Sequence, residues 1–324
     1  MAKLNFEGKV YSLQAEETVL ETLLRENLNV PYGCQGGVCQ TCMMRSTDTP
    51  PPAAAQVGLK EPLKKKNYFL PCVCYPENDM EIVRPDHSGI SLESKVVAKE
   101  SLSRDIIRVT LQFEGELDFR AGQFVNLTRS DGVTRSYSIA NPPGKDNLLE
   151  FHIRRLPNGE FSAWAYDELA VGESLILSEP QGDCHYLPDY SDRELLLVGT
   201  GSGLAPLYGI VLDALENDHS GSIHLYHGSR NTEGLYLVDE LRQLATNNEK
   251  FNYTPCISGE DVADGYSAGR AESVALSNIS DLKGWTVFLC GHPEMVSQAK
   301  KQAYLSGASL QNIYSDPFLV NSPK

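Results

Sequence analysis

Hydrophobic and polar residues follow three different patterns along the chain. In the first, an alternating stretch over 3–11 precedes an amphipathic stretch over 16–26, and these predict a strand and a helix. In the second, strand-like runs alternate with Gly, Pro and Asp turns between 94 and 188, which predicts an antiparallel barrel with one helix near 162–169. The strands expected in this barrel include 106–113, 123–128 and 148–154.

In the third pattern, from residue 193 onward, apolar strands alternate with helices. Such alternation predicts a doubly wound parallel sheet, in which ligands lie beyond the carboxyl ends of the strands. The strands expected here are 195–198, 223–227, 251–257 and 287–290, and the helices are 205–215 and 238–246.

These patterns predict a multidomain α+β and α/β protein. Turn-forming residues at 86–89 mark a linker after the first segment. We therefore expect a β-grasp-like domain over 1–87, an antiparallel β-barrel over 94–188 and a doubly wound parallel-sheet domain over 189–324. A chain of 324 residues is long enough for each of these domains to bury its own core.

Charge and hydropathy narrow the classes of partner. The formal net charge of -15 argues against a nucleic-acid partner, because phosphate backbones are bound by Lys and Arg patches and the basic run here is the triplet 64–66. The chain has no run of about eighteen apolar residues that would predict a membrane anchor, and the N-terminus lacks the pattern of a signal peptide. We therefore expect a cytoplasmic protein.

Five of the eight cysteines lie in the first quarter of the chain. Cytoplasmic thiols are kept reduced, so such a cluster points to a metal rather than to disulfides. Cys34, Cys39 and Cys42 have the spacing C-x4-C-x2-C, in a glycine-rich loop whose N–H groups can turn toward sulfur. This is not the C-x2-C knuckle usual for zinc. A two-iron cluster needs a fourth thiolate from a distant strand, and Cys72 and Cys74 are both candidates.

The cysteine loop resembles that of plant-type ferredoxins, whose last ligand follows the third after twenty-nine residues and stands two residues before a Tyr-Pro pair. Cys72 meets both conditions, with Tyr75 and Pro76 behind it. Strand alternation cannot separate Cys72 from Cys74, because residues i and i+2 share a strand face. The resemblance therefore implies a [2Fe-2S] cluster and selects the fourth ligand. The implied ligands are Cys34, Cys39, Cys42 and Cys72.

A second motif, Arg135-Ser136-Tyr137-Ser138, resembles the flavin motif of the ferredoxin reductase superfamily. There the Arg pairs with the flavin pyrophosphate, the Tyr packs on the isoalloxazine ring, and the last Ser approaches flavin N5. A fixed cation, a flat amphipathic ring and a small donor suit these tasks. Taken singly, Arg135 as a surface ion pair or Tyr137 as a core residue would be the simpler interpretation. The order of this motif and those that follow favours the flavin site.

Two later segments resemble the next elements of that superfamily. The strand that contains His152, Ile153 and Arg154 implies backbone support for the ribityl and phosphate region of FAD. The segment with Gly159 and Ser162 implies a helix N-terminus that receives the pyrophosphate. We expect Ser162 to cap this helix and to leave N–H groups free for the anion.

A strand that runs through a glycine loop into a helix predicts a dinucleotide site, because the phosphates can approach the backbone there. We expect a proline to begin the helix. This loop resembles the nicotinamide lobe of the same superfamily. Its residues are Gly199, Thr200, Gly201, Gly203, Ala205 and Pro206.

A further loop resembles the Cys-Gly-Pro-Pro loop of that lobe, from which His292 is a departure. The resemblance implies that Cys290 lies beside nicotinamide C4 and that it flanks the hydride path with Ser138. A small core residue is the alternative role for Cys290. Phe318 would cover the flavin face until nicotinamide displaces it. The residues of the loop assigned to the cofactor are Cys290, Gly291, Pro293 and Met295.

Cofactor preference depends on the adenosine ribose pocket. In NADPH-using relatives a Ser-Arg pair follows the strand that here spans 251–257, whereas this chain continues with Ser-Gly-Glu-Asp at 258–261. An acidic turn repels a 2'-phosphate and suits a ribose hydroxyl. Arg230, which follows Ser229, could still provide a cation. We expect NADH, with NADPH disfavoured.

The order of the three domains resembles that of the reductases that serve bacterial oxygenases, including the benzoate dioxygenase reductase type. It implies electron transfer from NADH through FAD and [2Fe-2S] to a one-electron protein acceptor such as a terminal mono- or dioxygenase. Two alternatives stay open. One is the reductase of a deoxysugar dehydration system, and the other is a redox sensor that holds the cofactors without turnover.

Overall fold

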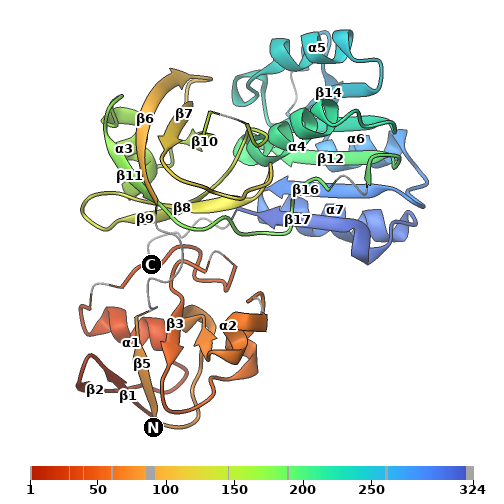
Figure 1. Cartoon of the computed structure of the whole chain (residues 1–324). Helices are drawn as coiled ribbons and strands as arrows, with labels where there is room; N and C mark the ends of the chain where they lie inside the picture. The colour runs from red at the N-terminus through yellow and green to blue at the C-terminus, as the bar shows by residue number, and fades with distance from the viewer. Residues whose placement is uncertain are drawn as a thin grey trace.

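The structure is a computed structural model, and three sheets follow one another along the chain (Figure 1). Each sheet has its own buried hydrophobic cluster, and the third has one on each face. None of the helices in the described part of the chain has the length and apolar content needed to span a bilayer. The described residues are 2–28, 30–38, 40–59, 61–84, 92–144, 146–187, 190–259 and 262–318.

The N-terminal sheet is mixed, with the strand order β2-β1-β5-β3-β4 and parallel pairing of β1 with β5. The predicted strand over 3–11 is a hairpin, because Glu7 and Gly8 turn the chain with positive φ. This arrangement agrees with the predicted β-grasp. The elements are β1 (Lys3–Phe6), β2 (Lys9–Ser12), α1 (Val19–Arg25), β3 (Met44–Ser46), α2 (Glu61–Lys65), β4 (Tyr68–Phe69) and β5 (Met80–Val83).

Helix α1 begins three residues later than the predicted amphipathic stretch. Thr18 accepts a hydrogen bond from the Glu21 N–H at 3.1 Å, while the Glu21 carboxylate accepts one from the Thr18 N–H at 3.0 Å. This reciprocal capping box fixes the first turn. Val19, Leu20 and Leu23 then face the sheet and are buried in its core.

The second sheet is antiparallel, with the order β10-β7-β6-β11-β8-β9. A bridge between Ile139, just after β9, and Phe151 in β10 closes it into the predicted barrel. Helix α3 (Glu160–Asp167) packs against the barrel, close to the predicted 162–169. The strands are β6 (Leu92–Ser101), β7 (Ile106–Phe113), β8 (Phe124–Thr128), β9 (Thr134–Ser138), β10 (Leu148–Arg154) and β11 (Ser174–Leu177).

The third sheet is entirely parallel, with the order β15-β14-β13-β12-β16-β17. Its strands are β12 (Leu195–Thr200), β13 (Ile223–Ser229), β14 (Phe251–Ile257), β15 (Ser267–Ala268), β16 (Thr286–Gly291) and β17 (Ile313–Pro317). Its helices are α4 (Leu204–Glu216), α5 (Val238–Asn247), α6 (Ala271–Asn278) and α7 (Pro293–Leu305). Strands β15 and β17 and helices α6 and α7 add to the predicted elements.

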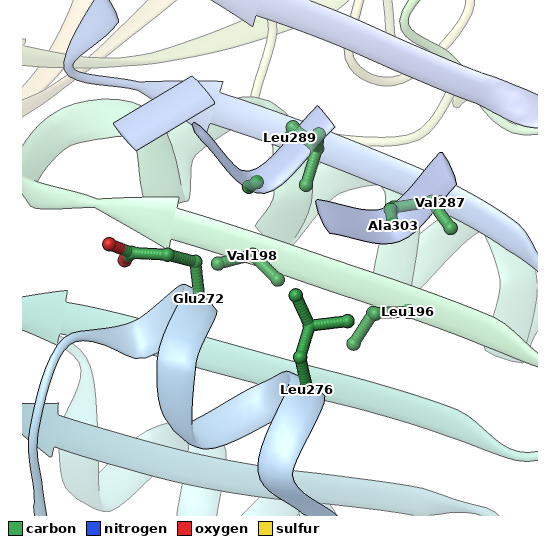
Figure 2. Close-up of a pocket in the computed structure, with 8 residues that line it drawn as sticks. Leu196, Val198, Glu272, Leu276, Val287, Leu289 and Ala303 are labelled. Carbon is green, nitrogen blue, oxygen red and sulfur yellow. The ribbon is translucent and has the colours of Figure 1, made fainter. Parts of the chain in front are cut away.

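Both faces of this sheet are buried, as a doubly wound sheet requires. Leu195 and Leu197 pack toward α4 and α5, whereas Leu196 and Val198 pack toward α6 and α7. Figure 2 shows the second face, where side chains from β12 and β16 meet α6 and Ala303 of α7. This explains the uninterrupted apolar run over 195–198, because every residue of a two-sided strand faces a helix.

Candidate functional site

The cysteine loop folds around the Sγ atom of Cys34. The N–H groups of Gly36 and Val38 donate to this sulfur at 3.3 and 3.4 Å. Gly37 has a φ of +76°, and a Cβ there would come within 3.2 Å of Val73, so the loop needs glycine at this position. Amide donors aimed at sulfur are what a cluster-bound thiolate accepts. The loop therefore fits the predicted [2Fe-2S] cluster.

The two candidates for the fourth ligand lie in different surroundings. Cys72 interacts with Cys42 and Cys34, and its hydrogen bond with Cys42 lowers its pKa in spite of burial. Cys74 is fully buried, and this burial raises its pKa to about 12. Within the described residues these thiols do not form a site for a single metal ion. Cys39, the remaining predicted ligand, lies outside the described residues.

Cys72 does not come from a strand, and in this respect the prediction was wrong. It lies in a 3-10 turn over Pro71–Val73, directly after β4. Pro71 has no N–H to donate to a ladder, so the strand pairing ends there and the chain turns. The Val73 N–H then bonds to the Leu70 carbonyl at 3.1 Å.

In β9, Arg135 and Tyr137 occupy alternate positions and both lie against α3. The Arg135 guanidinium is 3.4 Å from the Glu160 carboxylate in the first turn of that helix. The Tyr137 ring lies 5.4 Å from the ring of Phe161, measured between centroids. The structure therefore brings the predicted pyrophosphate cation and the predicted ring support to one end of one helix.

The cap of α3 differs from the prediction. The N-cap residue is Gly159, and Ser162 lies inside the first turn, where its Oγ accepts a hydrogen bond from the Leu156 N–H at 3.2 Å. The chain enters the helix through glycine because a side chain there would collide with Ser162. No side chain caps the helix start, so its first N–H groups stay available to an anion.

The predicted residues of β10 have their side chains in contact with other protein groups. The His152 imidazole is buried 3.1 Å from the Tyr236 hydroxyl and 3.0 Å from the Glu150 carboxylate, and burial lowers its pKa. Ile153 is in the barrel core, and Arg154 donates to Asp105 at 2.7 Å. The support of the flavin by the backbone of β10 stays a prediction.

At the junction of the barrel with the parallel sheet, Ser138 donates a hydrogen bond to the Asp316 carboxylate at 3.2 Å. Asp316 in β17 is the register partner of Cys290 in β16. Burial raises the pKa of Asp316 to about 6, and the bond from Ser138 opposes this rise. Cys290 is fully buried with its sulfur 3.5 Å from that of Cys184, and burial raises its pKa strongly.

The two glycine loops of the sheet pack directly on each other. A Cβ on Gly203 would collide with the backbone of Cys290, and one on Gly291 would lie 2.6 Å from the Thr200 carbonyl oxygen. Thr200 Oγ1 accepts a hydrogen bond from the His292 N–H at 3.0 Å. Both loops stand at the carboxyl ends of adjacent strands, β12 and β16, which is the expected position for a dinucleotide.

The buried side chains of His227 and Leu207 lie against the glycine loop. His227 Nε2 lies 3.3 Å from the Gly201 carbonyl oxygen, and burial lowers the pKa of His227 to about 4. A Cβ on Gly199 would lie 2.7 Å from Leu207 of α4. Ala205 in the first turn of α4 is buried as well. The loop is therefore fixed against the sheet and the helix.

The prolines of the two loops differ in position. Pro206 is the third residue of α4, which begins at Leu204, so the expectation that Pro206 starts the helix was wrong by two residues. Pro293 does start α7, and His292 caps it by accepting a hydrogen bond from the Glu294 N–H at 3.3 Å. The departure from Cys-Gly-Pro-Pro thus places a helix cap, and Met295 behind it is buried.

The predicted ribose loop lies beside the loop that follows β13. The Ser258 N–H donates to the Ser229 carbonyl at 3.0 Å, and the Gly259 N–H donates to the Arg230 carbonyl at 2.9 Å. The Arg230 side chain is exposed. The acidic pair at 260–261 lies outside the described residues. The loop that carries Arg230 and the start of the turn after β14 are therefore neighbours.

Sequence reasoning missed two residues at the junction of the barrel with the parallel sheet. Asp316 joins Ser138 and Cys290, but a single acid near the C-terminus has no local signature. The nearest signal was its place two residues before Phe318, whose N–H donates to the Gly291 carbonyl at 2.7 Å. Cys184 comes from a loop after β11, and its spacing from Cys290 of 106 positions gave no pattern to detect.

Comparison with protein families divides the chain into the same order. The 2Fe-2S iron-sulfur cluster binding domain matches residues 3–77, the oxidoreductase FAD-binding domain 93–186 and the oxidoreductase NAD-binding domain 197–301.

Individual relatives match over nearly their whole length. The chain is 32% identical over 324 residues to the reductase subunit of an aromatic O-demethylase from Amycolatopsis, covering 96% of each protein. It is 26% identical to a CDP-6-deoxy-L-threo-D-glycero-4-hexulose-3-dehydrase reductase from Yersinia pestis, covering 98% of each. A crystal structure of an Amycolatopsis cytochrome P450 reductase superposes with a TM-score of 0.70 at 29% identity, over 98% of this chain and 99% of that one.

Proposed function

We propose, from the premise that this chain belongs to the FAD- and [2Fe-2S]-containing reductases of oxygenase systems, that its electron acceptor is a terminal oxygenase. The three domains make the protein an oxidoreductase that moves electrons from NAD(P)H through FAD to [2Fe-2S]. We further propose that it prefers NADH and acts in the cytoplasm. The acidic turn at 258–261 supports the first of these, although Arg230 stands beside it.

One observation carries the proposal: strand β9 contacts both neighbouring domains. Ser138 at its end bonds to Asp316, beside Cys290, and Ser136 lies 3.4 Å from Thr41 in the cysteine loop. A flavin held on this strand would lie between the hydride site and the cluster. A redox sensor without turnover would not need the nicotinamide side of this arrangement.

Each residue has a task that its surroundings support. FAD, when bound, accepts a hydride as an electron pair and releases electrons singly. Arg135 and the uncapped start of α3 would hold the pyrophosphate, and Tyr137 would support the ring. Ser138 and Cys290 would flank the hydride path. Phe318 would cover the flavin face until nicotinamide takes its place.

Asp316 adds a proton-holding group to this site. The Ser138 hydroxyl donates a hydrogen bond to the Asp316 carboxylate, and this bond fixes the orientation of the hydroxyl. Burial holds the pKa of Asp316 at about 6, so near neutral pH this carboxyl can take up or release a proton. We propose it as a positioning residue for Ser138.

The test is NADH oxidation by the holoprotein with cytochrome c as one-electron acceptor. Replacing Cys39 by Ser should abolish cytochrome c reduction while ferricyanide, a small acceptor that flavin can reduce directly, is still reduced. An unchanged cytochrome c rate in the variant would contradict the route through the cluster. Reconstitution with a terminal oxygenase component then tests the partner, with product formation as the readout.

A second acceptor class has one observation in its favour, the similarity to the deoxysugar dehydrase reductase of Yersinia pestis. The same holoprotein tested against a dehydrase component would distinguish the two. Rapid steady-state NADH consumption with either acceptor would exclude a sensor that does not turn over.

A further inference from the structure

The N-terminal domain contacts the barrel at both ends of its cysteine loop. Before the loop, the Arg135 guanidinium donates to the Tyr32 carbonyl at 3.4 Å and lies 6.0 Å from the Tyr32 ring centre. Within the loop, Thr41 Oγ1 donates to Asn126 Oδ1 at 3.1 Å and lies 3.4 Å from Ser136 Oγ. Figure 1 shows this domain on the side of the barrel that carries β8 and β9.

The acceptor of the Thr41 bond is held rigidly. Asn126 and Ser136 are register partners in β8 and β9, and Ser136 Oγ donates to Asn126 Oδ1 at 2.7 Å. The backbone of Asn126 exchanges two hydrogen bonds with Ser178, at 2.9 and 3.1 Å. The Asn126 side chain is buried. A fixed and buried acceptor makes the bond from Thr41 directional, and the bond resists sliding of the loop over the strand.

Thr41 also has a special place in the sequence. It directly precedes Cys42, one of the expected cluster ligands, while Ser136 directly precedes Tyr137, the expected support of the flavin ring. One side-chain contact therefore links the two redox sites through immediate chain neighbours. The contacts of Tyr32 reinforce this link at the other end of the loop.

We propose that Thr41 is a positioning residue, whose hydroxyl docks the cysteine loop on β8 and β9 and so sets the separation between flavin and cluster. This inference rests on the proposed function. The step it governs forms and breaks no covalent bond: one electron leaves reduced flavin and one enters the oxidised cluster. Its rate depends on the separation of the two sites, which the docked loop keeps short.

The experiment compares Thr41→Val, Thr41→Ser and Thr47→Val in the full-length holoprotein. Thr47 is an exposed threonine of the same domain whose hydroxyl bonds within that domain, to the Glu81 carbonyl at 3.3 Å, so its replacement is the matched control. Iron, acid-labile sulfide and FAD contents are measured first. The first readout is the ratio of cytochrome c reduction to ferricyanide reduction with NADH.

Loss of one interdomain hydrogen bond should lower this ratio about threefold to tenfold in Thr41→Val. Ferricyanide reduction should stay unchanged, because hydride transfer occurs at the other junction. Thr41→Ser keeps the hydroxyl and should restore the ratio, and Thr47→Val should match the wild type. A wild-type ratio in Thr41→Val would overturn the inference.

A second readout does not depend on activity. Amide hydrogen exchange of the oxidised holoprotein should be faster in Thr41→Val in peptides that cover the cysteine loop and β8 to β9, and unchanged in Thr47→Val. Equal exchange in all variants would overturn the docking role. If Thr41→Val lost iron, Asn126→Val removes the acceptor from the barrel side, and the same two changes are expected.

The two proposals fail in different ways. If the wild type reduced ferricyanide but not cytochrome c, the proposed route would be wrong, and the exchange experiment would still decide whether Thr41 docks the loop. If the wild type reduced both acceptors and Thr41→Val did as well at equal rates, only the docking role would be wrong.

Discussion

The barrel meets its two neighbours in contrasting ways. Toward the parallel sheet the junction is packed and buried: a Cβ on Gly209 of α4 would lie 2.9 Å from Ala140, and the sulfurs of Cys184 and Cys290 lie 3.5 Å apart. Toward the cysteine domain, hydrogen-bond distances connect the half-buried Thr41 with the half-buried Ser136 and the buried Asn126.

The contrast follows from what crosses each junction. A hydride moves only between atoms held about 3–3.5 Å apart in the correct orientation, so its junction must be rigid to a fraction of an ångström. An electron crosses to the cluster without atomic contact, so a few directional hydrogen bonds suffice. The molecule thus uses tight backbone packing on one side and polar docking on the other.

The largest expected effect comes from a substitution that changes the cysteine domain alone. Cys72→Ser should lose the cluster and lower cytochrome c reduction by more than about 100-fold, with ferricyanide reduction kept, because a missing ligand is more severe than a lost outer contact. Cys74→Ser is the control, since Cys74 is buried in the core beside the site. Iron and acid-labile sulfide analysis checks the result, and loss of both from Cys74→Ser with retention of both in Cys72→Ser would reverse the ligand assignment.

The second largest effect comes from a substitution in the glycine loops of the parallel-sheet domain. Gly203→Ala places a Cβ against the Cys290 backbone, so the loops must separate, which should cost about 1–3 kcal/mol of unfolding free energy and slow flavin reduction by NADH. Gly144→Ala, where a Cβ meets nothing within 4 Å, is the matched control. Denaturant unfolding and anaerobic stopped-flow absorbance measure both quantities. An unaffected Gly203→Ala would show that the packing of the two loops is not required.

A third prediction uses pH to sharpen the hydride side. The pKa of Asp316 is raised to about 6 in the fold, so the wild type loses stability as pH rises from about 4 to about 6. Asp316→Asn cannot ionise and should become more stable than the wild type by about 1–2 kcal/mol above that window, and not below it. Denaturant unfolding midpoints, measured below about pH 4 and above about pH 6, give the difference in stability. Asp146→Asn, in an exposed turn, should show no such change.

The smallest effect probes one polar bond in the packed junction. Tyr236→Phe removes the hydroxyl that lies 3.1 Å from His152 Nδ1 and should lower the unfolding free energy by about 1 kcal/mol. Tyr304→Phe is the control, because Tyr304 is an exposed residue of α7. Equal stability of the two variants would mean that the Tyr236 hydroxyl does not stabilise this junction.

The sequence by itself determined the order of the domains and most elements of secondary structure. Apolar periodicity, glycine loops and capping residues are local properties, so strands such as β12 and helices such as α5 lie within a few residues of their predicted bounds. The motif residues at the cysteine loop, in β9 and at the two glycine loops could be listed for the same reason. Their roles as ligands of cofactors remain predictions that the experiments above test.

Only the tertiary structure decided which of these residues meet. Cys72 and Cys74 are equivalent by alternation, and they differ because Pro71 ends the strand and turns one sulfur toward Cys42. Ser138 and Asp316 are 178 positions apart, yet they bond because the end of β9 meets the end of the edge strand β17. Sequence periodicity indicates on which face of a strand or helix a residue lies, whereas contacts between distant segments depend on how whole sheets pack.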